Sequence, residues 1–220
     1  MLPTFKTNLD EVKNKITSIG NDLVKANELI LKALKDCDQE LFNDARNSIK
    51  NITSRTDEID NAIIKILALY TPEAKDLRRV VAYFKITNEI ARACSNTRSF
   101  IRGFTDVCND LDVQTINEYT LPMQSSTVKA IRTSIAMINV EDADELQEMY
   151  EDVLIEENKA DDLYEMIERQ LVTEAENSTK GFEKFHKMLK ALRKSEKIAG
   201  RAISVANLLV YIKLGGTIHN

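Results

Sequence analysis

The chain has 220 residues and a formal net charge of −5, and 30% of its residues are charged. Glycine (6) and proline (3) are scarce and aromatic residues make up 6%. This profile is typical of long amphipathic helices and lacks the turn residues that a sheet protein needs. Basic residues are spread along an acidic sequence, which argues against nucleic acid as the main partner.

Helix-forming patterns occupy the first half of the chain. The first helix is predicted from apolar residues in steps of three and four: Leu9, Val12, Ile16, Ile19, Leu23, Ala26 and Ile30. A polar stretch at 35–40 ends it. A second apolar stripe, residues 41–70, is predicted as one helix with a gap at Thr56. A third helix begins at Pro72 and fades into a candidate linker at 103–112.

The turn before the third helix contains one of the three prolines. Proline suits the first helical position, where its missing N–H costs nothing. We therefore expect Thr71 to be an extended N-cap, with Pro72 as the first helical residue and Glu73 at the positive end of the helix.

The second half repeats this arrangement. Residues 115–122 are predicted to be a helical lead-in that Pro122 breaks or kinks, followed by a helix over 123–138. A long helix follows, and then a last helix with clean periodicity that Gly215 ends as its C′ residue. Six helices in two sets of three predict an all-α fold made of two tandem, elongated three-helix bundles related by internal duplication, residues 1–108 and 109–220.

Carboxylates interrupt the apolar stripes of the second half. Glu196 lies in the stripe of the last helix, and Glu157 with Asp161 lies in that of the preceding helix. Thr56 and Asp60 occupy the matching positions in the first half. Carboxylates in a helix seam are costly unless they are paired, hydrogen-bonded or bound to a metal. The sequence leaves three alternatives open: a hard-cation site, a salt-bridged layer with Lys159, Arg193 or Lys197, or a seam that faces solvent.

Other chemistry is sparse in this sequence. Glu183 and His186 form half of a di-iron motif, but the only other histidine is His219 in the tail. We find no phosphate-binding glycine loop and no nucleophile motif, so we expect a protein that is not an enzyme. Cys37, Cys94 and Cys108 lack metal-site spacing, and we expect three reduced thiols in a soluble, cytoplasmic protein without a signal peptide.

Several stretches resemble the PhoU family of phosphate-uptake regulators. The P-x-A-x-D-L-R hallmark is matched by Pro72, Ala74, Asp76, Leu77 and Arg78, and the family's Tyr-…-Gly ending is matched by Tyr211 and Gly215. Residues 57–63 and 158–171 are similar to further family stretches. The resemblance covers the whole chain in the family's order, and it implies the same duplicated helical fold.

The resemblance also implies metal clusters held by pairs of E/D-x-x-x-D motifs. The matching positions in the first repeat are Thr56, Asp60, Ala91 and Ser95, which leaves Asp60 as a vestige. The second repeat keeps three acids of four, since Gly200 replaces the last one. We therefore expect at most a weak, degenerate site for a divalent or iron-type metal ion, with Glu157, Asp161 and Glu196 as its ligands.

The function implied by the resemblance is regulation of phosphate uptake and of phosphate-starvation signalling. The implied partners are a phosphate ABC transporter and its sensor histidine kinase, bound by a homodimer that associates with the membrane only peripherally. Two alternatives stay open at this point. One is a divergent helical scaffold that kept the fold without phosphate signalling, and the other is a metal-binding protein.

Overall fold

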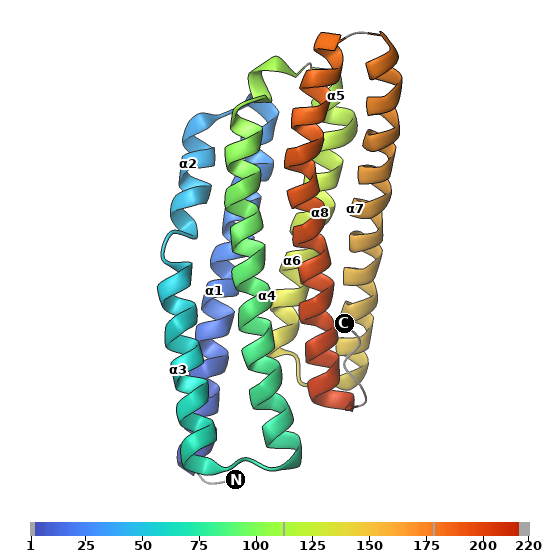
Figure 1. Ribbon diagram of the computed structural model, residues 1–220. Coiled ribbons are helices and arrows are strands. Elements are labelled where there is room, and N and C mark those ends of the chain that lie inside the picture. Colours follow the sequence, from blue (N-terminus) through green and yellow to red (C-terminus); the bar gives the residue numbers. More distant parts are fainter. Residues whose placement is uncertain (1–2, 112, 178, 216–220) are drawn as a thin grey trace.

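Figure 1 shows an elongated bundle of nearly parallel and antiparallel helices. The computed structural model describes residues 3–111, 113–177 and 179–215, and this part of the chain contains no strand. The first set of helices is α1 (Pro3–Asp36), α2 (Gln39–Ser48), α3 (Ile52–Tyr70) and α4 (Ala74–Thr105). The second is α5 (Val113–Thr115), α6 (Leu121–Ala136), α7 (Ala143–Asn177) and α8 (Thr179–Leu214). The predicted all-α class and the two sets of long helices are confirmed.

The two sets of helices share one hydrophobic core. Buried side chains of every long helix belong to a single cluster, and α4 packs along α8 between the two halves (Figure 1). The apolar stripe predicted for the first helix is buried, with Val12, Ile16 and Ile30 almost fully enclosed. The division into residues 1–108 and 109–220 stays a prediction, because this shared core continues across it.

The second predicted helix is broken, which corrects the expectation of one helix over 41–70. α2 ends at Ser48 and α3 begins at Ile52, with a turn at 49–51. The stripe survives the break because Ile49 and Ile52 are both buried. Arg98 of α4 donates to the Ile49 carbonyl oxygen at 3.2 Å, so a carbonyl that the break leaves without a helical partner is satisfied.

The turn before α4 also differs from its prediction. Thr71 has left-handed backbone angles (φ 43°, ψ 60°) and ends α3, and the extended residue Glu73 is the N-cap of α4. The carbonyl oxygen of Glu73 accepts from the N–H of Asp76 at 3.0 Å. The expectations of Thr71 as an extended N-cap and of Pro72 as the first helical residue were therefore wrong, because α3 needs its own left-handed C-terminal residue before Pro72 and α4 begins only at Ala74.

The lead-in to α6 remains helical. Ile116–Thr120 forms a π-helical turn between α5 and α6, and Pro122 lies in the first turn of α6. Proline lacks an N–H and crowds the carbonyl four residues earlier, and the wider π turn accommodates it. At the other end of the second half Gly215 has φ 79° and its N–H bonds to the Tyr211 carbonyl at 3.1 Å, which confirms its role as the terminating residue of α8.

A disulfide joins Cys37 and Cys108, so the expectation of three reduced thiols was wrong for these two. The pair is 71 residues apart in sequence, but the ends of α1 and α4 lie at the same end of the bundle, and the two Cα atoms are 5.7 Å apart. Cys94 is free and buried. Burial raises the pKa of its thiol to about 12.

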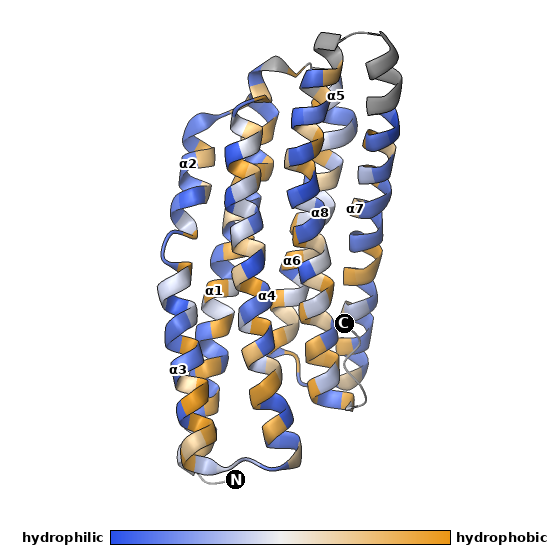
Figure 2. Cartoon of the chain, viewed as in Figure 1, coloured by the Kyte–Doolittle hydropathy of each residue, from blue (hydrophilic) through white to orange (hydrophobic). Residues whose placement is uncertain are grey.

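Hydropathy follows the packing in Figure 2, where the sides of the helices that face outward are largely hydrophilic. The ribbon is largely hydrophobic in the lower half of α3, where Ile64, Leu67 and Leu69 are exposed. Within the described residues, no helix has the combined length and hydropathy that crossing a bilayer requires.

Candidate functional site

The three predicted acids of the second repeat lie on two helices that pack together. Glu157 and Asp161 are one turn apart on α7, and Glu196 is on α8, where its exposed fraction is 9%. Glu157 faces α8 at Gly200, since its Oε1 lies 4.0 Å from the place that a Cβ on Gly200 would occupy. Gly200, at the position of the fourth expected acid, therefore lies next to the Glu157 carboxylate.

The pKa values of Glu157 and Asp161 reflect the charges of nearby acids. Burial raises the pKa of Glu157, and the charges of Asp161 and Glu196 raise it further. The pKa of Asp161 is raised first by burial and then by Glu196. Glu157 and Asp161 therefore both feel the negative charge of Glu196 on the facing helix.

Two cations of α8 already accompany Glu196. Lys197 donates to its Oε1 at 3.0 Å, and the Arg193 Nε lies 3.4 Å from its Oε2. That Oε2 is buried and accepts no hydrogen bond. Arg193 also lies over the ring of Tyr164, 5.0 Å from its centroid. The salt-bridged alternative thus describes Glu196, whereas Lys159 pairs instead with Glu156 at 2.8 Å.

The donor set fits a hard cation by chemistry, since it consists of carboxylate oxygens. In the described part of the chain, however, no three His, Cys, Asp or Glu side chains are arranged to hold a metal ion. A metal at this cluster would need Glu196 to turn away from Arg193 and Lys197. The assignment of Glu157, Asp161 and Glu196 as weak ligands stays a prediction.

The first repeat keeps a single acid at the matching positions. Asp60 is half-buried on α3 and its Oδ1 is enclosed without a hydrogen-bond partner. Burial raises its pKa, with a smaller contribution from Asp57. Thr56 donates to the Thr53 carbonyl oxygen at 2.8 Å and is thereby committed to its own helix. Ala91 has no side-chain ligand atom, and the assignment of Asp60 as a vestigial metal ligand stays a prediction.

The hallmark residue Arg78 contacts the family-like ending of the chain. Its guanidinium lies over the Tyr211 ring, 5.4 Å from the centroid. A Cβ on Gly215 would lie 2.7 Å from the Arg78 Nη1, so a larger residue would displace this guanidinium, and the positive φ of Gly215 favours glycine there. Two motifs separated by more than 130 residues in sequence therefore meet at one end of the bundle.

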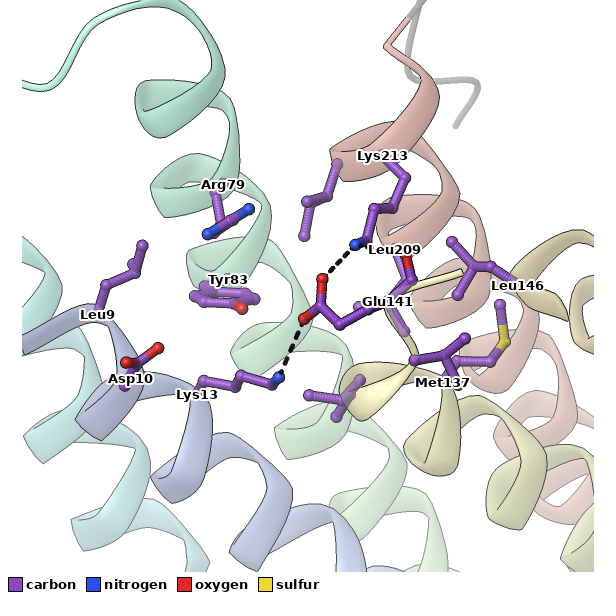
Figure 3. Close-up of a pocket in the computed structure, with 13 residues that line it drawn as sticks. Leu9, Asp10, Lys13, Arg79, Tyr83, Met137, Glu141, Leu146, Leu209 and Lys213 are labelled. Carbon is purple, nitrogen blue, oxygen red and sulfur yellow. Dashed lines mark hydrogen bonds and ion pairs between the residues drawn. The ribbon is translucent and has the colours of Figure 1, made fainter. Parts of the chain in front are cut away.

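A small polar pocket lies beside this contact (Figure 3), with a volume of about 50 Å³. Glu141, from the loop before α7, points into it and forms an ion pair with Lys213 of α8 and a longer one, 3.7 Å, with Lys13 of α1. The hydrogen bond from Lys213 lowers the pKa of Glu141 more than its burial raises it. Glu141 therefore ties the two halves of the molecule together near Arg78.

Tyr83 of α4 borders the same pocket. Burial raises the pKa of its hydroxyl to about 12. Sequence reasoning missed this group entirely, because Lys13, Glu141 and Lys213 are far apart in sequence and form no spaced motif. Proximity to the Arg78 hallmark was the one signal that could have pointed to this end.

The histidine half-motif is not joined by a second one within the described residues. His186 is half-buried on α8 and its ring stacks on Phe182 with centroids 5.6 Å apart. His219 lies outside the described residues. Two sites are therefore indicated by both the motifs and the geometry. One is the acid cluster of Glu157, Asp161 and Glu196, and the other is the corner where Arg78 contacts Tyr211.

Comparisons with known proteins point to one family. Residues 16–100 match the PhoU domain. Two proteins called phosphate-specific transport system accessory protein PhoU homolog are each 22% identical to the chain. The one from Pseudomonas aeruginosa matches over 96% of this chain and 86% of its own length, and the one from Pseudomonas putida over 96% and 81%.

Solved structures share the fold. A crystal structure of PhoU from Pseudomonas aeruginosa aligns with a TM-score of 0.85 at 22% identity, and it covers 96% of this chain and 100% of that one. A crystal structure of the phosphate transport system regulatory protein PhoU from Streptococcus pneumoniae aligns with a TM-score of 0.79 at 16% identity, over 98% and 99%. Residues 16–100 therefore match the PhoU domain, and the chain as a whole shares the fold of the solved PhoU structures.

Proposed function

We propose that the chain regulates phosphate uptake and phosphate-starvation signalling by contacting a phosphate ABC transporter and its sensor histidine kinase. The observation that carries the proposal is the match, over 96% of the chain, to two proteins named as phosphate-specific transport accessory proteins. The regulator acts by binding and without chemical turnover. It works in the cytoplasm and reaches the membrane only through its partners.

The arrangement of the hallmark supports a rigid binding module. Arg78 is held against Tyr211, and Glu141 joins α1 to α8 at the same end. The family-like motifs thus build a fixed corner of the bundle. A partner that binds at this corner would contact residues from both halves of the chain.

A homodimer is part of this proposal. Ile64 and Leu67 of α3 are one turn apart, with exposed fractions of 58% and 39%, on the helix whose lower half is hydrophobic in Figure 2. Apolar surface of this kind favours association with a second copy. Sedimentation of the purified protein should give the mass of a dimer, and a monomer at micromolar concentration would count against this part.

Deletion of the gene in the source organism tests the regulatory role. Cells grown in abundant phosphate should then express phosphate-starvation genes, and a plasmid copy of the wild-type gene should restore repression. A variant with Arg78→Ala should restore repression less well at equal protein level, because the corner loses its contact with Tyr211. Unchanged expression after deletion would refute the role and favour the alternative of a scaffold that kept the fold.

The competing metal-binding function has support of its own, since burial and, after it, neighbouring carboxylates raise the pKa values of Glu157 and Asp161. A divalent cation would relieve that repulsion. Elemental analysis of protein purified without chelator is the discriminating measurement. Iron, zinc or manganese that disappears with Glu157→Ala or Glu196→Ala would favour this function, and metal-free wild-type protein that ignores added Mn²⁺ would exclude it.

A further inference from the structure

One face of the molecule is hollowed along the line where α4 meets α8. The two helices run side by side in Figure 1. A hollow of about 640 Å³ lies between residues 81–92 of α4 and 201–208 of α8, and a second one of about 410 Å³ lies between residues 99–107 and 187–194. We call the two together the α4/α8 groove.

Basic residues gather in this groove although the chain as a whole is acidic. Seven lining residues are lysine or arginine and only two, Glu89 and Asp106, are acidic. The chain has a net charge of −5, so the groove has the opposite sign to the molecule. These residues are spread along the sequence, but helical periodicity on two antiparallel helices brings them onto one face.

Most of these cations have no acidic partner in the part of the chain that the structure describes. Arg201 pairs with Glu89 at 2.9 Å. The remaining six form no ion pair there with Asp or Glu: Lys85, Arg92, Arg102, Lys187, Lys190 and Lys194. Like charges held along one groove create a positive potential that attracts an acidic ligand.

Apolar residues accompany the cations. Leu77, Val81 and Phe84 follow helical spacing along α4, with exposed fractions of 41%, 39% and 39%, and the last two line the larger hollow together with Ile203. The smaller hollow is lined by two small residues that lie close together, since a Cβ on Gly103 would touch the Cβ of Ala191 at 3.6 Å. The groove therefore offers apolar contact and a close approach to backbone as well as charge.

We propose that the α4/α8 groove binds an acidic amphipathic helix of a partner protein. From Val81 to Arg102 the two hollows together span about 30 Å of α4, the length of a helix of about 20 residues. The partner helix would set an apolar stripe against Val81 and Phe84 and its carboxylates against the six free cations. The inference names the chemistry of a partner, and it rests on the proposed function only in that the chain acts by binding protein.

The mixed lining favours a peptide helix over other anions. Nucleic acid would engage the cations but would leave Val81 and Phe84 without apolar contacts. A bilayer surface is flat on this scale and would not follow a groove between two helices. An amphipathic helix satisfies the charge, the apolar row and the concave shape together.

Fluorescence anisotropy with a designed probe tests the proposal on the full chain. The probe is a labelled, capped helix of about 20 residues with leucines on one stripe and glutamates elsewhere. Two control peptides carry lysine in place of glutamate, or the same acidic composition with the stripe scrambled. The acidic striped helix should bind, and both controls should bind at least about tenfold more weakly.

Matched variants locate the site. The triple variant Lys187→Glu, Lys190→Glu and Lys194→Glu should weaken binding by about tenfold or more. The control Lys25→Glu, Lys32→Glu and Lys65→Glu makes the same charge change at exposed positions of α1 and α3 and should keep most of the affinity. Phe84→Ser tests the apolar row without changing charge and should also weaken binding, with circular dichroism verifying that each variant is helical.

Several outcomes would overturn the proposal. They are no binding of the striped acidic helix, equal loss in both triple variants, and equal binding of the scrambled peptide. The proposal would also be refuted if the protein bound phosphatidylserine vesicles or duplex DNA but did not bind the striped acidic peptide. The gene-deletion phenotype is independent of this assay, so binding with no phosphate phenotype would retain the groove and reject the proposed function.

Discussion

Individual carboxylates carry the clearest chemical signal in this chain. The sequence predicted that Glu157, Asp161 and Glu196 converge, because each one interrupts an apolar seam at the same register. It left open whether a metal or a basic side chain balances them. Long, flexible side chains such as Arg193 and Lys197 reach several positions from one helix, so periodicity alone does not say which acid they pair with.

The raised pKa values of Glu157 and Asp161 predict a pH-dependent stability. A folded-state pKa above the unfolded value means that the folded protein holds protons more tightly, so stability falls as pH rises from the ordinary carboxyl range through the raised pKa values. Asp161→Asn removes one interacting charge. The variant should therefore have a higher melting temperature than the wild type at about pH 7 and a nearly equal one near the ordinary carboxyl pKa, about pH 4.

The matched control for this prediction is Asp152→Asn, an exposed acid on the same helix outside the cluster. It should leave the difference between the two pH values unchanged. Calorimetry at both pH values provides the measurement. An increase of equal size at both, or one that Asp152→Asn reproduces, would mean that the cluster is not the source.

At the scale of helices, a buried polar network sets how four of them pack. Asn27 of α1 donates to Thr97 of α4 at 3.2 Å, and Gln124 of α6 donates to the Asn27 Oδ1 at 3.1 Å. Ser195 of α8 donates to the Gln124 Oε1 at 2.9 Å and bonds to Thr127 at 3.0 Å. All five residues are fully enclosed, so each hydrogen bond fixes one helix relative to another, and the bond from Gln124 to Asn27 crosses between the two halves.

Replacing the centre of this network should destabilise the protein strongly. Gln124→Ala removes the donor to the Asn27 Oδ1 and the acceptor of the Ser195 hydroxyl and opens a cavity, and together these should cost about 2–4 kcal/mol of unfolding free energy. Urea denaturation measures the loss, and Gln147→Ala on α7, outside the network, serves as the control. The double variant with Asn27→Ala should lose less than the two single losses added together; additive losses would show that the two residues are not coupled.

Helix boundaries show where sequence reasoning stops. Stripe periodicity located every long helix, and the burial of Ile49 and Ile52 follows the predicted seam. The break between them was not predicted because the residue that compensates for it is distant in sequence. Arg98 of α4 donates to the Ile49 carbonyl oxygen, which the break leaves without a helical partner. Local signals near Thr71 were overridden in the same way, since the end of α3 and the start of α4 compete for one short turn.

Viewed as a whole, the molecule combines features that no single stretch of sequence contains. The duplicated order of helices could be predicted, because each half repeats its pattern in the same direction. The α4/α8 groove and the Glu141 ion pairs could not, since their members come from different helices. Their proximity is a property of antiparallel packing and of the shared core between the two halves.

The Cys37–Cys108 disulfide gives a prediction for the whole first half. It closes a loop that contains α2, α3 and α4, and a cross-link over that length stabilises mainly by restricting the unfolded chain, by about 2–4 kcal/mol. Reductant should lower the melting temperature of the wild type. The double variant Cys37→Ser and Cys108→Ser should melt at the lower temperature already and should not respond to reductant.

Thiol titration under denaturing conditions makes this prediction strict. Protein purified without reductant should have one free thiol, that of Cys94, and reduction should raise the count to three. Cys94→Ala is the control, because it should keep the response of the melting temperature to reductant. Three free thiols before reduction would contradict the disulfide, and a wild-type melting temperature that ignores reductant would contradict its contribution to stability.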